Sequence, residues 1–301
     1  MNTWQPSPAA QRTLDKLLLQ VIDWGEQMNL HRNMAAVTFD ASAPPGGQVQ
    51  STGELVFPES VGRAFEEPRK VAEYRQAVHA VTVTALDKRA TGTYDEAGEF
   101  AVEDLRLDPG LPADYFVNDG LREAYWAANG DRICLRLSPE LGADLLAASD
   151  PCDRPVARDA ALALADTYAR TRNEWPDEGV KNLLQAPRNK VFETVVDAKL
   201  ASQLRQAYTP AAREALGELR GGLARGLRTG FENLAEETHL DRSEVNLRVA
   251  ELMKPVDETA RTVKETFNAL SAQQTDRGAA TAAADRQAGA PSKHRWTAFG
   301  R

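Results

Sequence analysis

The residues whose spacing most directly suggests a chemistry lie between Gly217 and Gly230. Within this segment Gly222, Gly226 and Gly230 recur every fourth residue, so a helix would place them on one face as a groove without side chains. Each glycine in a helix interior costs roughly 0.5–1 kcal/mol relative to alanine, and such a run therefore requires a compensating role. Three roles remain open: close helix packing, a break between helices, or access of a phosphate to the backbone.

Six cations in and around this segment form a candidate site for an anion or a nucleic acid. Arginine makes bidentate hydrogen bonds to phosphate, and a glycine-rich backbone lets phosphate approach its N–H groups. The predicted binding residues are Lys199, Arg205, Arg213, Arg220, Arg225 and Arg228. The segment matches neither a P-loop nor a dinucleotide-binding fingerprint, so a packed helix with solvent-facing arginines is the structural alternative.

Apolar residues near the C-terminus form a second candidate site, for a protein partner. From Val249 to Leu270 they recur at gaps of three and four, which is the spacing of a coiled-coil seam, although Pro255 is expected to kink or split the helix. A helix with one apolar stripe must bury it against its own domain or against another chain, and we expect another protein surface.

The last nine residues, 293–301, add aromatics and cations after a polar spacer. This pattern is typical of a short docking motif, with a frayed chain end as the alternative. Together with the apolar stripe, the predicted partner-binding residues are Val256, Val263, Phe267, Leu270, Arg295, Trp296 and Phe299.

No local motif identifies a catalytic centre, a metal site or a cofactor. The four histidines lie outside nucleophile, metal-ligand and phosphotransfer motifs, although a pair between Cys152 and a distant histidine would leave no local signature. We expect Cys134 and Cys152 to be free thiols in a reducing compartment. The sequence therefore predicts no cofactor and no metal, leaves catalytic residues unassigned and disfavours an enzyme.

Charge and composition restrict the class of partner. Residues 1–150 hold 13 Lys and Arg against 23 Asp and Glu, whereas residues 151–301 hold 23 against 21, so only the second half is suited to a polyanion. No apolar stretch approaches the roughly 18 residues of a membrane span, and no signal peptide is evident, so we expect a cytoplasmic protein without a membrane partner. The Ala- and Arg-rich, Ile-poor composition indicates a high-GC bacterial or phage genome.

Alternating residues predict a small, mainly antiparallel sheet over roughly 78–138. Val81 and Val83 alternate with threonines, and Ile133, Leu135 and Leu137 follow an Asn-Gly turn signal at period two. Between these runs we expect a hairpin joining residues 91–95 to 99–105.

Helical spacing dominates the rest of the chain. Ser7 and Pro8 form a cap-then-proline signature for a helix over 7–33, and Asp241 with Glu244 forms a capping box. Further helices are expected over 155–172, 177–207, 210–237 and 242–270, with no strand beyond 138. The predicted fold class is α+β, comprising an α+β domain over 1–150, an all-α helical domain over 151–271 and a flexible tail over 272–301.

These features favour a non-enzymatic interaction or assembly component of a bacterial or phage multi-protein complex, with self-association or a protein partner. One alternative is a nucleic-acid-associated module that uses the cations of 199–230. The other is an enzyme whose site lies between the two halves, drawing ionisable side chains from the 37–53 loop or the acidic region.

Overall fold

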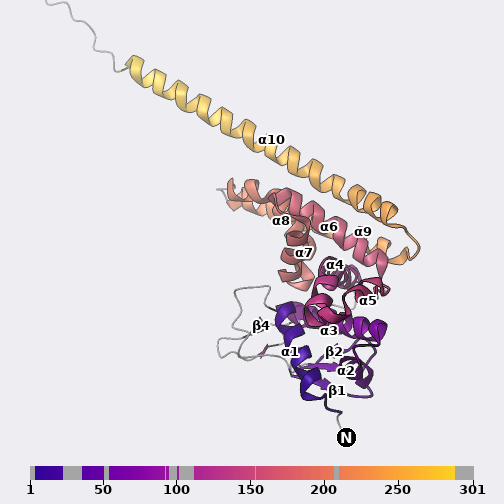
Figure 1. The fold of residues 1–301 in the computed structure, drawn as a ribbon. Coiled ribbons are helices and arrows are strands. Elements are labelled where there is room, and N and C mark those ends of the chain that lie inside the picture. Colours follow the sequence, from indigo (N-terminus) through magenta and orange to yellow (C-terminus); the bar gives the residue numbers. More distant parts are fainter. Residues whose placement is uncertain are drawn as a thin grey trace, which may run out of the picture.

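The protein is an α+β chain built mainly from helices, as the computed structural model in Figure 1 shows. The structure describes residues 4–22, 36–50, 54–91, 93–94, 100–101, 112–152, 154–206 and 210–288. Its elements are α1 (Pro8–Ile22), β1 (Val37–Phe39), β2 (Gln48–Val49), β3 (Leu55–Phe57), α2 (Glu59–Glu66), α3 (Val71–Thr91), β4 (Thr93–Tyr94), β5 (Phe100–Ala101), α4 (Pro112–Leu137), η2 (Pro139–Leu141), α5 (Gly142–Ala147), α6 (Pro155–Arg172), α7 (Pro176–Gln185), η3 (Arg188–Lys190), α8 (Val191–Gln206), α9 (Pro210–Glu236) and α10 (Arg242–Ala288).

The first helix begins where the sequence predicts. The Ser7 hydroxyl accepts a hydrogen bond from the Ala10 backbone N–H at 3.3 Å, as an N-cap does, and Pro8 is the first helical residue. Leu14 and Leu17 on its apolar face are fully buried. The remainder of the predicted 7–33 helix lies outside the described residues beyond Ile22.

The three-stranded sheet lies at 37–57, within a stretch that the sequence presents as a loop. β3 pairs in parallel with β1 and antiparallel with β2, so the sheet is mixed. The predicted hairpin is present in short form, because β4 and β5 pair antiparallel with Thr93 opposite Ala101. Each strand has only two or three residues, which is too short for alternation to reveal it.

The predicted sheet over 78–138 is wrong, because helices α3 and α4 fill most of that range. Val81 and Thr82 are both fully buried, since α3 packs against α1, α2 and α4 and has no polar face at this level. The Thr82 hydroxyl donates to the Val78 carbonyl at 2.7 Å and so avoids an unpaired buried group. The threonines that suggest a strand are therefore part of a buried helix.

The Asn-Gly turn signal also lies inside a helix. The Asn129 side chain donates to the Tyr125 carbonyl at 3.0 Å, one turn back along α4. A Cβ on Gly130 would come within 2.7 Å of the Trp126 indole, so the glycine provides room for that ring. Close packing, and not a turn, explains this glycine.

Helices α6 to α10 stack above α4, and α10 runs across the top of this layer (Figure 1). α4 packs against α6, α7 and α9 as well as α3, so one continuous apolar core runs through both halves of the chain. A Cβ on Gly120 would strike the backbone of Ala157, which shows how closely α4 approaches α6.

Helix α10 is longer than the sequence predicts. Its capping box is confirmed: Asp241 Oδ1 accepts hydrogen bonds from the Ser243 and Glu244 backbone N–H groups at 2.7 and 2.9 Å, and Glu244 accepts one from the Asp241 N–H at 2.9 Å. The helix passes Pro255 without a break, since that residue faces solvent and the carbonyl it leaves unpaired can bind water. It continues to Ala288 through an alanine-rich stretch expected to be flexible.

Candidate functional site

The glycines of the Gly/Arg segment divide into two kinds within α9. A Cβ on Gly230 would collide with the Leu252 side chain, so this glycine allows α9 and α10 to approach closely. Around Gly217, Gly222 and Gly226, nothing lies within 4 Å of a Cβ position. Helix packing therefore accounts for Gly230 alone, and the open glycines lie along the exposed side of an unbroken helix.

Arg228 belongs to a buried polar network instead of facing solvent. Its Nε donates to both oxygens of Asp114 at 3.2 and 3.3 Å, and its Nη2 donates to the Asn189 carbonyl at 3.1 Å. Nη2 also lies 3.5 Å from Glu193 Oε1, and the guanidinium lies 5.5 Å from the ring centre of Phe192. The Arg228 side chain is 13% exposed and that of Asp114 is 0% exposed, so this arginine ties α4 to α8 and α9.

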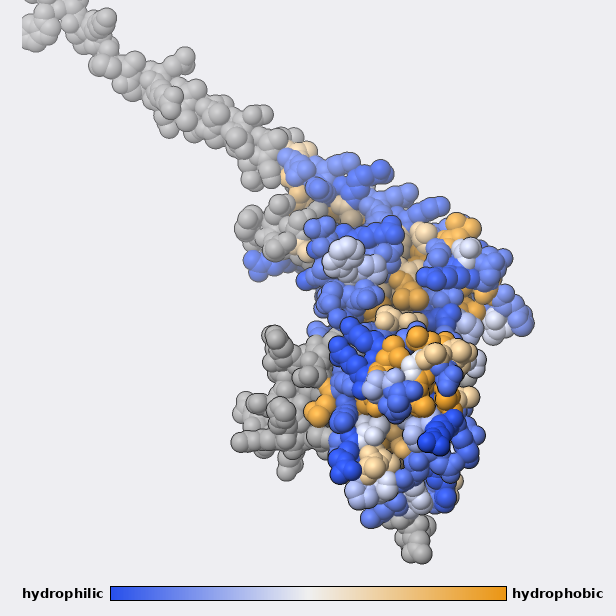
Figure 2. Space-filling model, in the orientation of Figure 1, coloured by the Kyte–Doolittle hydropathy of each residue, from blue (hydrophilic) through white to orange (hydrophobic). Residues whose placement is uncertain are grey.

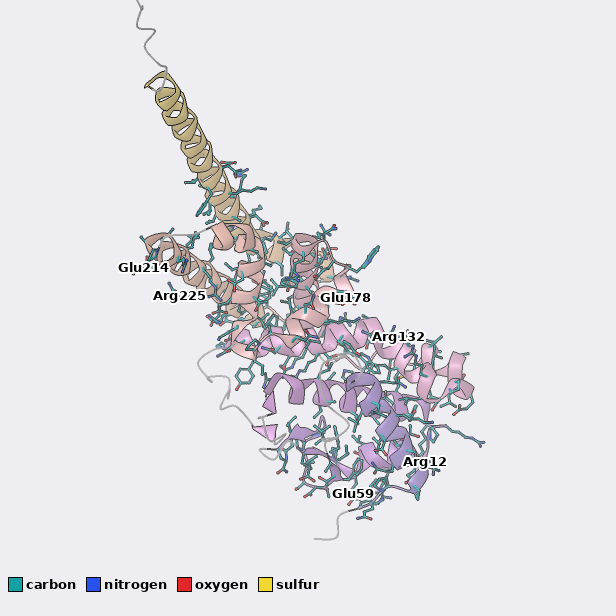
Figure 3. The ribbon with its side chains drawn as sticks, turned by 90° about the vertical axis from the view of Figure 1, so that its left-hand side faces the viewer. Arg12, Glu59, Arg132, Glu178, Glu214 and Arg225 are labelled. Atoms are coloured by element: carbon teal, nitrogen blue, oxygen red, sulfur yellow. The ribbon has the colours of Figure 1, made fainter. Side chains whose placement is uncertain are left out.

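Two further predicted cations are also paired with carboxylates. Lys199 Nζ lies 2.7 Å from Asp257 of α10, and Arg220 lies 2.5 Å from Asp197 of α8. Arg225 is exposed on α9, the helix that also carries Glu214 (Figure 3). Arg213 is exposed on the first turns of α9, and the side chain of Arg205 lies outside the described residues. Of the five cations whose side chains the structure describes, three are therefore paired with carboxylates and do not contribute to an open positive surface.

The predicted partner-binding residues lie along α10 and beyond it. Val256 is 1% exposed and belongs to the core, together with Val245, Val249 and Met253. Val263 and Phe267 are half-buried. The Leu270 side chain and residues Arg295, Trp296 and Phe299 fall outside the described part of the chain.

A site that the sequence does not reveal lies between α2, α3 and α4. His79 Nε2 and Glu123 Oε2 lie 2.9 Å apart, and their side chains are 8% and 11% exposed. The His79 ring packs edge-on against Trp126, with ring centres 5.1 Å apart. Both ionisable groups border a cavity of about 350 Å³ lined by Pro45, Gly46, Ser60, Val61, Ala64, Glu73, Gln76, Ala77, His79, Ala80, Val83, Glu123 and Pro151.

Cys152 lies beside this pair. Burial, and after it the negative charge of the nearby Glu123 carboxylate, raises the pKa of Cys152 to about 11. The thiol is therefore protonated at neutral pH and is not activated as a nucleophile. Sequence reasoning misses the His79–Glu123 pair for two reasons. The two residues are 44 positions apart, and the predicted sheet places residue 79 in a strand instead of on the face of α3 that packs against α4.

The described residues contain no group of three or more His, Cys, Asp or Glu side chains arranged to hold a metal ion. Both cysteines are free. Among the helices that the structure describes, none combines the length and apolar character needed to cross a membrane. Comparison with protein-family models, curated proteins and solved structures finds no match to this chain.

Proposed function

We propose that the protein is a non-enzymatic assembly component that binds a helical protein surface, its own second copy included, through α10. The observation that carries this proposal is the continuity of the apolar stripe. The positions that bury Val249, Met253 and Val256 against the body recur at the same spacing in Val263 and Phe267, which are half-buried further along α10.

The length of α10 supports this function. At 1.5 Å per residue, its 47 residues span about 70 Å, and the stretch after residue 260 accounts for about 42 Å of that length. Figure 1 shows the yellow, C-terminal part of α10 extending past α8 and α9. A helix of this length gains most of its stability from packing an apolar face, so a partner helix would stabilise it.

The surface of the body, outside α10, is a weaker candidate for the binding site. In the space-filling view of Figure 2, apolar side chains occur in separate patches among hydrophilic ones, and the described part of α10 carries charges of both signs along its flanks. Mixed charges beside an apolar seam are typical of helices that pair with other helices. The pairing of Lys199, Arg220 and Arg228 with carboxylates gives no comparable support to nucleic-acid binding.

Substitution of a stripe residue and of a residue on the opposite face tests this function. Phe267→Glu places a charge on the stripe, and Ala269→Glu places the same charge on an exposed position about 160° around the helix. Light scattering after size exclusion, and capture of partners from the native host, measure assembly. We expect Phe267→Glu to abolish assembly and Ala269→Glu to leave it intact, with both variants folded by circular dichroism.

Two results would contradict the proposal. In the first, the wild-type chain is a monomer without a captured partner. In the second, Phe267→Glu lowers the melting temperature while the hydrodynamic size stays that of the wild type, which would assign the stripe to the core of a single chain.

A further inference from the structure

The cavity beside His79 and Glu123 is a partly open site with acidic side chains in its lining, and the assembly function does not use it. Its lining includes the carboxylates of Glu73 and Glu123 and the imidazole of His79, and among the described residues that line it there is no lysine or arginine. We propose that this cavity binds a small organic cation, an alkylammonium or a guanidinium with a short methylene chain.

The charge of Glu123 is the first argument. Elsewhere in the described structure, the buried carboxylates of Asp114 and Asp159 are each paired with an arginine. Within the described residues the ion-pair partner of Glu123 is His79, whose charge depends on protonation. A buried carboxylate without a permanent cation carries a desolvation cost that a bound cation would offset.

The free nitrogen of His79 is an independent argument. With Glu123 ionised, Nε2 of His79 donates to the carboxylate, and in the neutral ring Nδ1 is then an acceptor. Within the described residues Nδ1 makes no hydrogen bond, although the side chain is buried and borders the cavity. The cavity therefore presents acceptors, which are matched by a ligand rich in N–H donors.

The remaining walls determine the size and the apolar part of the ligand. A volume of about 350 Å³ lies at the lower end of the range for small-molecule sites. The side chains of Val61, Ala64, Ala77, Ala80 and Val83 line the space next to the polar groups. Methylenes between two amino groups would contact these side chains, which favours a diamine over an inorganic cation.

Calorimetric titration of the full chain with putrescine tests this inference, with 1,4-butanediol and succinate as neutral and anionic molecules of the same chain length. Because the protein has a net charge of −8, weak attraction of polyamines to its surface must be separated from binding in the cavity. Glu123→Gln removes a carboxylate from the lining, and Glu140→Gln removes an exposed one that does not line the cavity.

We expect putrescine alone of the three probes to bind, and Glu123→Gln to weaken it about tenfold or more, the loss typical of one charge-assisted hydrogen bond. Glu140→Gln should change the affinity less than twofold. If Glu123→Gln fails to fold, Glu73→Gln, at an exposed position of the lining, should also lower the affinity for putrescine. Failure of putrescine, cadaverine and agmatine to bind at millimolar concentration, or equal loss in Glu123→Gln and Glu140→Gln, would overturn the inference. Neither result bears on assembly through α10.

Discussion

Removal of Arg228 should destabilise the protein more than removal of any exposed arginine on the same helix. Arg228→Met deletes the cation that neutralises Asp114 and the donor that satisfies the Asn189 carbonyl, while its aliphatic length is kept. The Asp114 side chain is 0% exposed, so no water can replace the lost guanidinium without local opening. The perturbation therefore isolates charge and hydrogen bonding from packing.

The expected cost follows from the burial of both partners. Breaking a buried ion pair by removing one member costs about 3–5 kcal/mol, because the other charge is left without compensation. Arg225→Met is the matched control, since Arg225 is an exposed residue of α9 and such substitutions change stability by about 0.5 kcal/mol or less. Addition of Asp114→Leu to Arg228→Met should restore part of the loss by removing the stranded carboxylate.

The pH dependence of this loss has a definite sign. Burial raises the pKa of Asp114, and Arg228 opposes the rise, so the pKa should increase further in Arg228→Met. Between the unfolded pKa and this raised folded pKa, the folded variant binds more protons than the unfolded chain, and its stability falls as pH rises. The deficit should therefore be smaller at pH 5 than at pH 7, changing by at most about 1.4 kcal/mol per pH unit.

Urea unfolding followed by circular dichroism, at pH 5 and pH 7, measures these differences. The reasoning about the buried network is refuted if Arg228→Met and Arg225→Met lose the same small amount at pH 7. It is also refuted if the deficit of Arg228→Met grows as the pH falls.

Two further predictions concern the glycines of α9 and the thiol beside the cavity. Gly226→Ala should stabilise the protein by about 0.5–1 kcal/mol in thermal unfolding, because a Cβ at this position meets no other atom. Gly230→Ala should destabilise the protein, because its Cβ would collide with Leu252. Equal effects of the two substitutions would contradict the packing assigned to Gly230. Cys152 should react with iodoacetamide at pH 8 on the order of a hundredfold more slowly than an unperturbed cysteine, by peptide mass spectrometry, and Glu123→Gln should speed the reaction. A fast reaction in the wild type would be inconsistent with the raised pKa.

Local signals predicted the helices of the second half well. Proline at the first helical position marks the starts of α6 and α9, and the expected ranges 155–172 and 210–237 agree with Pro155–Arg172 and Pro210–Glu236. The predicted 177–207 helix is divided into α7 and α8 by a connection that contains Pro187. Capping residues and prolines act on the backbone within one helical turn, so the local sequence alone is enough to predict where these helices begin.

In the first half of the chain, tertiary packing makes a helix, α3, of residues that the sequence assigns to a strand. Alternation at Val81 to Thr84 predicts a half-exposed strand, but α3 is covered on several sides and buries both residue types. The same context hides the His79–Glu123 pair, because the partners come together only after α3 and α4 pack. Burial on all sides removes the polar face from which helical spacing is recognised.

The position of α10 on the body gives its free end a mechanical property. Lys199, Leu252 against Gly230, and the buried valines up to Val256 hold the first four turns or so of α10, and Val263 and Phe267 are half-buried further along. About 32 Å of helix follows Phe267, so a tilt of roughly 10° at these contacts moves the tip by about 5 Å relative to Phe267. Small changes in side-chain packing between α8, α9 and α10 would therefore displace the C-terminal tip of α10 by about the diameter of a small side chain.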